Sequence, residues 1–389
     1  MSDQPLHPHT RAIRAGRGNN DTALAPVLWS SSTFFVDGVE EAQSFATDIT
    51  APKFYGRHSN PTVADFESAI APLEGAESAR AFASGMGAVS AVILGICSSG
   101  DHIVTQRQLY SHTQLIFQVL CPRFGIDVTF VDGTDADAWV AAVIPGKTTL
   151  VFAETPANPK LSLVDLGQLG AIAGPVTVVD STFATPLGQR PLEYGVDLVI
   201  HSATKAIAGH NDAILGVVAG SEELIAWIRG FAVLHGAVAS PFDALNGLRG
   251  MRTLPVRLRQ QTETASALAC VLEKHPQIER VFYPGLPSHP QYELAQRQLD
   301  SPGGLLTFDL VGGRAAGSRL VDAVELVQLA TSLGGPETLI THPASTTHRQ
   351  LSDEQRTAAG AENDVIRLSI GIETADDLIH DLDKALAAT

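Results

Sequence analysis

A lysine with two hydroxyl-bearing neighbours follows a short apolar run near the middle of the chain. The run is residues 196–200 (VDLVI), and Ser202, Thr204 and Lys205 come directly after it. Apolar runs of this length are typical of buried strands. Burial at a strand end disfavours the ammonium form and lowers the pKa of a lysine, so the neutral amine can attack a carbonyl. Lys205 is therefore a candidate Schiff-base lysine, and the two hydroxyls suit a phosphate; the alternative is a surface lysine after a strand.

A second short β-branched run ends in an acid, Asp180, after residues 177–179 (TVV). Pyridoxal phosphate chemistry needs an amine for the cofactor aldehyde and a carboxylate that keeps the pyridine nitrogen protonated, because the protonated ring is the electron sink. Two neighbouring parallel strands that end in Asp180 and Lys205 could supply both groups. The alternative for Asp180 is a helix cap or a turn residue, which acids at strand ends often are.

Seven short motifs resemble those of the Cys/Met-metabolism family of pyridoxal phosphate enzymes and occur in the family's order. That family includes cystathionine γ-synthase, cystathionine lyases, methionine γ-lyase and the O-acylhomoserine sulfhydrylases. The motifs are residues 55–62 (YGRHSNPT), 83–86 (ASGM), 154–159 (ETPANP), 201–205 (HSATK), 332–335 (SLGG), 341–345 (THPAS) and 367–371 (RLSIG). Together they span nearly the whole chain, and they imply pyridoxal 5'-phosphate (PLP) as the cofactor.

The pattern of elements predicts an α/β protein. Strands and helices alternate from residue 59 to 255, which predicts a mostly parallel sheet whose carboxyl edge gathers the site. The expected strands are residues 103–105, 128–131, 150–153, 176–179 and 196–200. We expect a PLP-binding domain at 59–255 and a smaller C-terminal α/β domain at 256–389, which begins with a long helix and ends with an amphipathic one. The resemblance implies PLP fold type I, the aspartate-aminotransferase-like architecture.

Residues 1–58 show little helical or strand periodicity and contain several prolines and glycines. Such a segment is either disordered or an arm that lies on something else. Aromatic residues such as Phe35 and Phe54 favour an arm, because they are costly to leave in water. The resemblance implies that the arm packs on a neighbouring subunit of a homotetramer (a dimer of dimers) with shared active sites. Tyr55 and Arg57 would then reach the neighbour's cofactor phosphate, which a guanidinium can grip with two hydrogen bonds.

The resemblance, together with the positions beside its motifs, assigns the site. The expected cofactor-binding residues are Tyr55, Arg57, Gly85, Met86, Tyr110, Asp180, Thr182, Ser202, Thr204 and Lys205. Lys205 and Tyr110 are the expected catalytic residues, and Tyr110 would stack on the ring and take part in proton transfer. The expected substrate-binding residues are His112, Asn158, Thr331, Ser332 and Arg367.

Two of these residues have open alternatives. Arg367 follows Val-Ile in a strand-like run, so it is either a rim charge or, as the resemblance implies, a buried clamp for the substrate α-carboxylate. His112 stands where the family usually has a small residue after Tyr110. It is a second acid or base, a polar substrate contact, or a histidine that faces solvent.

The resemblance implies γ-elimination or γ-replacement through a β,γ-unsaturated intermediate, with Lys205 moving the protons. The expected substrates are methionine, O-acylhomoserine or an oxygen-linked analogue such as canavanine. Thr331 stands where many cystathionine-specific members have a glutamate for the distal amino group, so cystathionine is not the expected main substrate. The alternatives are a cystathionine or cysteine β-lyase, a cystathionine γ-synthase or γ-lyase, and a non-catalytic binding protein on this fold.

Composition limits the partners and the compartment. The chain of 389 residues has a formal net charge of −16, which argues against nucleic acid or an anionic membrane surface as a partner. Its three cysteines, Cys97, Cys121 and Cys270, have no spacing that suggests a metal site or a disulfide framework. No signal pattern opens the chain, and no apolar run approaches the roughly 20 residues of a membrane span. We therefore expect a cytoplasmic protein without a metal ion that acts on a small amino acid.

Overall fold

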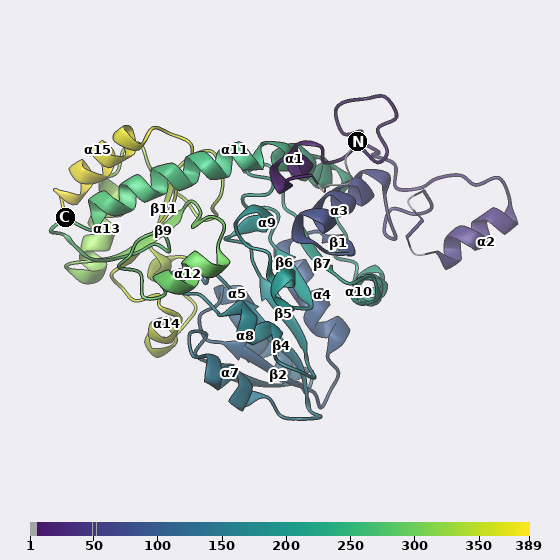
Figure 1. The fold of residues 1–389 in the computed structure, drawn as a ribbon, viewed down its shortest axis with the longest axis horizontal. Coiled ribbons are helices and arrows are strands. Elements are labelled where there is room, and N and C mark those ends of the chain that lie inside the picture. Colours follow the sequence, from purple (N-terminus) through teal and green to yellow (C-terminus); the bar gives the residue numbers. More distant parts are fainter. Residues whose placement is uncertain (1–5, 49, 52) are drawn as a thin grey trace.

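Two β-sheets organise the chain, and helices cover both of them (Figure 1). The structure is a computed structural model, and it describes residues 6–48, 50–51 and 53–389. No helix in these ranges is long and apolar enough to cross a membrane.

The larger sheet has seven strands, five of them parallel neighbours. In their order across the sheet the strands are β1 (Ser78–Phe82), β7 (Gly216–Gly220), β6 (Leu198–His201), β5 (Val176–Asp180), β4 (Thr148–Glu154), β2 (His102–Gln106) and β3 (Asp127–Val131). The five strands expected from the sequence are the five parallel ones, so those predictions are confirmed. The sequence analysis missed β1 and β7, which are antiparallel to each other, because small residues and Arg80 interrupt their apolar pattern.

Both faces of the larger sheet are buried, which explains the nearly continuous apolar runs of its parallel strands. In β4, Leu150 and Phe152 pack into one apolar cluster, whereas Val151 and Ala153 pack into another on the opposite face. The helical segments around this sheet are α3 (Pro61–Glu74), α4 (Gly85–Ile96), α5 (Ser111–Leu115), η1 (Ile116–Leu120), α6 (Cys121–Arg123), α7 (Ala136–Ala142), α8 (Leu166–Gly170), α9 (Thr185–Gly188), η2 (Pro191–Tyr194) and α10 (Glu222–His235).

The smaller sheet has five strands. Its strands, in order, are β10 (Gln328–Leu329), β11 (Leu339–Thr341), β12 (Val365–Ser369), β9 (Leu305–Leu310) and β8 (Ile278–Phe282). Strands β11 and β12 are buried at every position. The accompanying helical segments are α12 (Tyr292–Gln298), α13 (Gly313–Ala323), η3 (Pro343–Ser345), α14 (Asp353–Ala359) and α15 (Ala375–Leu386). The predicted strand that holds Arg367 and the predicted terminal amphipathic helix are both present.

One long helix, α11 (Pro241–Leu272), joins the two cores. Leu248 and Leu254 in its first half pack into the core of the larger sheet, and Leu268 and Leu272 in its second half pack under the smaller sheet. The boundary predicted between residues 255 and 256 lies within this helix, at a proline that the helix contains. The division into domains at that point stays a prediction.

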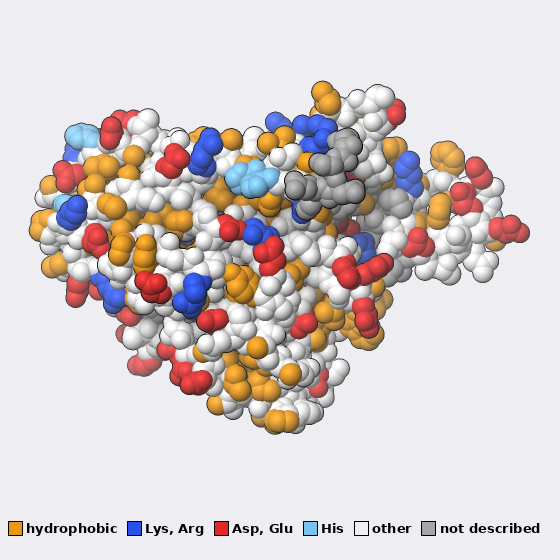
Figure 2. Space-filling view, viewed as in Figure 1, with side chains coloured by type: hydrophobic (Ala, Val, Ile, Leu, Met, Phe, Trp, Pro, Cys, Tyr) orange, Lys and Arg blue, Asp and Glu red, His pale blue; other side chains and the backbone are white. Residues whose placement is uncertain are grey.

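The N-terminal segment contains two helices that the sequence pattern did not reveal. The first, α1 (Pro8–Ile13), packs against α3 and α11 of its own chain. The second, α2 (Val39–Thr47), projects away from the body at the right of Figure 1. Helices this short contain too few turns to show a periodicity. Figure 2 shows hydrophobic side chains exposed on this projection, where Phe35 and Val39 are 93% and 84% exposed.

Candidate active site

A cavity of about 330 Å³ lies at the carboxyl edge of the larger sheet, where residues of the smaller sheet complete its wall. It contains most of the residues that the sequence assigned to the site. Those that line it are Gly85, Met86, Tyr110, Asn158, Asp180, Thr182, Ser202, Thr204, Lys205, Thr331, Ser332 and Arg367. Within the described ranges, no group of three or more His, Cys, Asp or Glu side chains could hold a metal ion.

Lys205 follows β6 and points into this cavity without an acidic partner. Its Nζ donates a hydrogen bond to Ser332 Oγ at 3.0 Å, and no ion pair of the described residues includes it. Burial, and then the charge of Arg367, lower the pKa of Lys205 to about 8. A substantial fraction of the amine is therefore neutral near pH 8, which is the form that attacks a carbonyl or accepts a proton.

Arg367 on β12 is a buried guanidinium that faces the cavity. It donates from Nη1 to Asn158 Oδ1 at 2.9 Å and from Nη2 to the carbonyl of Ser332 at 3.0 Å. It is only 3% exposed, and burial lowers its pKa to about 10. No carboxylate of the described residues pairs with it, and a buried charge without a counter-ion is costly. These contacts exclude the rim-charge alternative and leave a clamp for an anion.

Ser332 links Lys205 to Arg367 through an unusual backbone conformation. Its φ of +94° lies in the region that favours glycine. This conformation directs the hydroxyl toward Lys205 and the carbonyl toward Arg367. Backbone strain of this kind is concentrated at functional sites.

Asp180 ends β5 with one carboxylate oxygen engaged. Oδ1 accepts from the backbone N–H of Thr182 at 3.0 Å and from its hydroxyl at 2.5 Å. No donor of the described residues bonds to Oδ2. Burial raises the pKa of Asp180. A buried carboxylate with a free oxygen at a cavity suits a cationic ring nitrogen, which would stabilise its charged form.

The N-terminus of α4 faces the cavity from the other side. Gly85 begins the helix, and a Cβ atom there would lie 2.7 Å from Ser202 Cβ, so only glycine permits this close approach. Ser84 caps the helix by accepting from the N–H of Gly87 at 3.0 Å. The remaining free N–H groups and the Ser202 hydroxyl could hold a phosphate. Thr204 is less available, because its hydroxyl exchanges two hydrogen bonds with the backbone of Leu215.

Three of the predicted site residues do not line the cavity of this chain. Tyr55 is 42% exposed, and Arg57 lies over its ring and donates to the carbonyl of Val233 at 2.8 Å. His112 is exposed on α5, with its ring 5.1 Å from that of Tyr110. The solvent-facing alternative describes His112 best.

The sequence analysis missed a central acid, Glu154, at the end of β4. One oxygen accepts from the N–H of Tyr110 at 2.8 Å and the other from the N–H of Asn158 at 2.8 Å. Burial, and then the charge of Asp180 beside it, raise the pKa of Glu154 to about 8. Glu154 stands at the end of an expected strand, as Asp180 does, so the same reasoning could have found it. It fixes the backbone on both sides of the cavity.

Tyr110 keeps its proton in these surroundings. Burial, and then the charge of Glu154, raise the pKa of its phenol, and Arg367 opposes them to a smaller extent. A neutral phenol at the cavity wall can donate a proton or a hydrogen bond.

A lysine at the carboxyl edge of a mostly parallel sheet, beside a strand-end acid and a helix N-terminus, defines the class of fold-type-I PLP enzymes. Comparisons with known proteins identify a family within this class. Residues 9–387 match the family of Cys/Met metabolism PLP-dependent enzymes, and the chain belongs to that family. It is therefore a PLP-dependent enzyme.

Similar proteins and structures cover nearly the whole chain. The O-succinylhomoserine sulfhydrylase of Pseudomonas aeruginosa is 44% identical over an alignment of 387 positions that covers 97% of this chain and 95% of that protein. The L-methionine gamma-lyase of Fusobacterium nucleatum subsp. polymorphum is 43% identical, with 97% of each chain covered. A crystal structure of cystathionine gamma synthase from Xanthomonas oryzae pv. oryzae, in complex with cystathionine, has a TM-score of 0.93 and 38% identity, with 99% of each chain covered.

The low pKa of Lys205 predicts how the apoprotein takes up PLP. The rate of covalent attachment should rise about tenfold per pH unit below pH 8 and level off above it, because only the neutral amine attacks. Stopped-flow absorbance measures the rate, and mass spectrometry after borohydride reduction measures the attachment. Lys205→Ala should abolish attachment. Lys160→Ala, which removes a lysine paired with Asp309 outside this cavity, should leave it intact. Attachment in the Lys205→Ala protein would place the reactive amine elsewhere.

The contacts of Glu154 predict a loss of catalysis in Glu154→Gln. The amide replaces one acceptor oxygen with an NH₂ group that faces a backbone N–H, so one of the two clamps is lost. A buried N–H left without an acceptor costs about 1–3 kcal/mol, so we expect kcat/KM to fall about tenfold. Glu373→Gln is the control, because Glu373 accepts similar bonds from Thr338 outside the cavity. Equal losses in both variants would mean a general effect on folding.

Proposed function

We propose that this enzyme catalyses γ-elimination or γ-replacement on a γ-substituted amino acid such as methionine or an O-acylhomoserine. The observation that carries the proposal is the pair Lys205 and Arg367, an amine of lowered pKa and an unpaired guanidinium that meet at Ser332 in one cavity. One group can move protons while the other holds a carboxylate. The names of the similar proteins, which act on substituted homoserines, methionine or cystathionine, support this reaction type.

The residues present fit PLP. Lys205 would hold its aldehyde carbon, the free oxygen of Asp180 would face its ring nitrogen, and the N-terminus of α4 with Ser202 would hold its phosphate. When bound, PLP supplies an electron sink that stabilises negative charge at the substrate α-carbon.

The residues of the chain divide the remaining work. Arg367 and Asn158 hold the α-carboxylate and so orient the bond to the α-proton. Lys205 removes that proton once its amine is free, and it carries a proton to and from the neighbouring carbons, because its side chain is the only amine that lines the cavity among the described residues. Tyr110 supplies a protonated phenol at the wall.

The residues in the outer part of the cavity favour substrates without a second charged group. Thr331 is exposed at its edge, and the acids that line the cavity within the described ranges are Glu154 and Asp180. Glu154 is occupied by two backbone N–H groups, and Asp180 is placed for the cofactor. A second ammonium on the substrate would therefore meet no free carboxylate among these residues. The experiment that tests the proposal is incubation with γ- and β-substituted amino acids and identification of the products. Turnover of β-substituted amino acids alone would contradict it.

Thr331 predicts the order of substrates. Wild-type enzyme should have a lower kcat/KM on cystathionine than on the better of methionine and O-acylhomoserine. Thr331→Glu should raise the relative kcat/KM for cystathionine by about tenfold, since a carboxylate can pair with the distal ammonium. Thr331→Gln, which has the same shape without the charge, should give no such gain. A wild-type preference for cystathionine would show that other residues recognise the distal group.

We also propose that the enzyme is a homotetramer, a dimer of dimers, in which Tyr55 and Arg57 contribute to the cavity of a neighbouring subunit. The support is that both residues lie on an exposed segment away from their own cavity, next to a projecting helix with exposed aromatic and aliphatic side chains. Hydrophobic surface of this kind marks interaction sites.

Shared cavities predict complementation between two inactive variants. Arg57→Ala and Lys205→Ala chains should each have little activity, and a mixed dimer should regain one cavity with both residues intact. After subunit exchange by random pairing, half of the dimers are mixed, and each mixed dimer has one restored site out of two. The expected activity is therefore about a quarter of the wild-type activity per subunit. Activity of the exchanged mixture, without separation of the dimers, measures this. No recovery after confirmed exchange would show that Arg57 acts within its own chain.

A further inference from the structure

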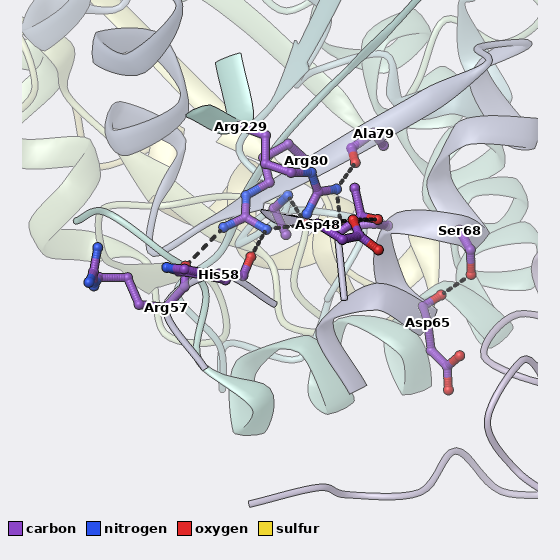
Figure 3. A network of polar contacts seen from close by, with 11 residues as sticks. Asp48, Arg57, His58, Asp65, Ser68, Ala79, Arg80 and Arg229 are labelled. Atoms are coloured by element: carbon purple, nitrogen blue, oxygen red, sulfur yellow. Dashed lines mark hydrogen bonds and ion pairs between the residues drawn. The ribbon is translucent and has the colours of Figure 1, made fainter. Parts of the chain in front are cut away.

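A buried cluster of three charged side chains lies where the N-terminal arm meets the larger sheet (Figure 3). Glu67 on α3 accepts from Arg80 on β1 at 3.3 Å and from Arg229 on α10 at 2.8 Å. The two arginines are 1% and 6% exposed, and Glu67 is 5% exposed. Two guanidinium groups thus share one carboxylate, and among the described residues neither forms an ion pair with a second acid.

The guanidinium of Arg80 also donates hydrogen bonds to the backbone of the N-terminal arm. Its Nη1 donates to the carbonyl of His58 at 3.0 Å, and its Nη2 reaches the carbonyl of Arg57 at 3.4 Å. Arg229 instead donates to the carbonyl of Ala79, within the sheet. Figure 3 shows the Arg57 side chain pointing away from the cluster while its backbone stays beside it. Within the part of the chain that the structure describes, Arg80 is therefore the member of the cluster that is hydrogen-bonded to the arm.

The segment 55–58 has few other ties to the body of the chain. Among the described residues, its other hydrogen bonds to residues 59–255 are those from the Ser59 N–H to the carbonyl of Tyr55 at 3.2 Å and from the Arg57 side chain to Val233, and Gly56 bonds to Ser32 within the arm itself. If Arg57 turns to grip a phosphate in a neighbouring subunit, its bond to Val233 breaks. The carbonyl contacts of Arg80 then remain as the side-chain anchor of Arg57 and His58.

We propose that Arg80 is a positioning residue for the phosphate of the cofactor in the neighbouring subunit, acting through the backbone of Arg57 and His58. This inference rests on the proposed function, in which Arg57 serves that phosphate. Glu67 holds the guanidinium of Arg80 in place, since it also accepts from the N–H of Ala81 at 2.9 Å and so is fixed to β1. The strand that carries Arg80 leads directly into Ser84 and the helix N-terminus of this chain's own cavity. One strand thereby supports two cofactor sites.

The test measures PLP affinity rather than activity. Apoprotein is titrated with PLP, followed by absorbance, for wild type, Arg80→Met, Arg57→Ala and the double variant. Arg80→Met leaves Glu67 and Arg229 as a neutral pair, so the fold should persist. We expect Arg80→Met to raise the Kd for PLP about tenfold, and the double variant to bind no more weakly than Arg57→Ala, because the effect of Arg80 passes through Arg57.

Two further variants separate positioning from stability. Arg229→Met disturbs the same carboxylate but removes no hydrogen bond to the backbone of Arg57 or His58, so it should lower the melting temperature and change the Kd by less than about twofold. Arg80→Lys keeps the charge but loses the planar guanidinium with its several N–H donors, so it should give an intermediate Kd. If Arg80→Met does not fold, the Kd of Arg80→Lys serves as the test. An unchanged Kd in the Arg80 variants, or effects of Arg57→Ala and Arg80→Met that multiply, would overturn the inference. A normal Kd in Arg57→Ala would instead overturn the proposed subunit sharing, and the inference with it.

Discussion

Four charged groups, two of them buried and two half-buried, meet in one cavity without forming an ion pair among the described residues, and the rest of the structure depends on keeping them apart. Lys205 and Arg367 are cations, and Asp180 and Glu154 are acids. Burial costs each charge its hydration, so the pKa values of the bases fall and those of the acids rise. Direct pairing would relieve that cost and close the site. The cavity instead keeps the two cations and the two acids unpaired among the described residues.

The fold keeps these groups apart by placing them on different elements. Asp180 and Glu154 are register partners on adjacent parallel strands, and Lys205 follows the next strand. Arg367 belongs to the other sheet, and Ser332 brings its carbonyl and hydroxyl to the two cations through a positive φ. Helix α11 has one half in each apolar core, so it fixes the distance between the sheets. The apolar cores thus set the geometry of the charges.

The sequence predicted those parts of the structure that repeat a pattern. The five parallel strands were readable because both faces of their sheet are buried, and the strand-end residues Asp180 and Lys205 followed from them. Antiparallel β1 and β7 have mostly small residues, so they gave no such signal. His112 was expected near the substrate because it follows Tyr110 closely. Yet α5 begins at Ser111 and buries Thr113 and Gln114, so His112 faces outward. Sequence proximity could not show the direction of that side chain.

The N-terminal arm can be anchored in two ways, by hydrogen bonds to its backbone or by burial of its apolar side chains, and the two ways have different consequences. From the sequence alone, an arginine within a strand is expected at the surface. Only the structure, in which Arg80 is buried beside Glu67, reveals its contacts with the arm. An apolar anchor would have to bury the aromatic side chains of the arm against its own chain. The hydrogen bonds from Arg80 to the carbonyls of Arg57 and His58 fix the backbone and do not involve the side chains of these two residues. Tyr55 therefore stays partly exposed, while the backbone that follows it is held in one direction.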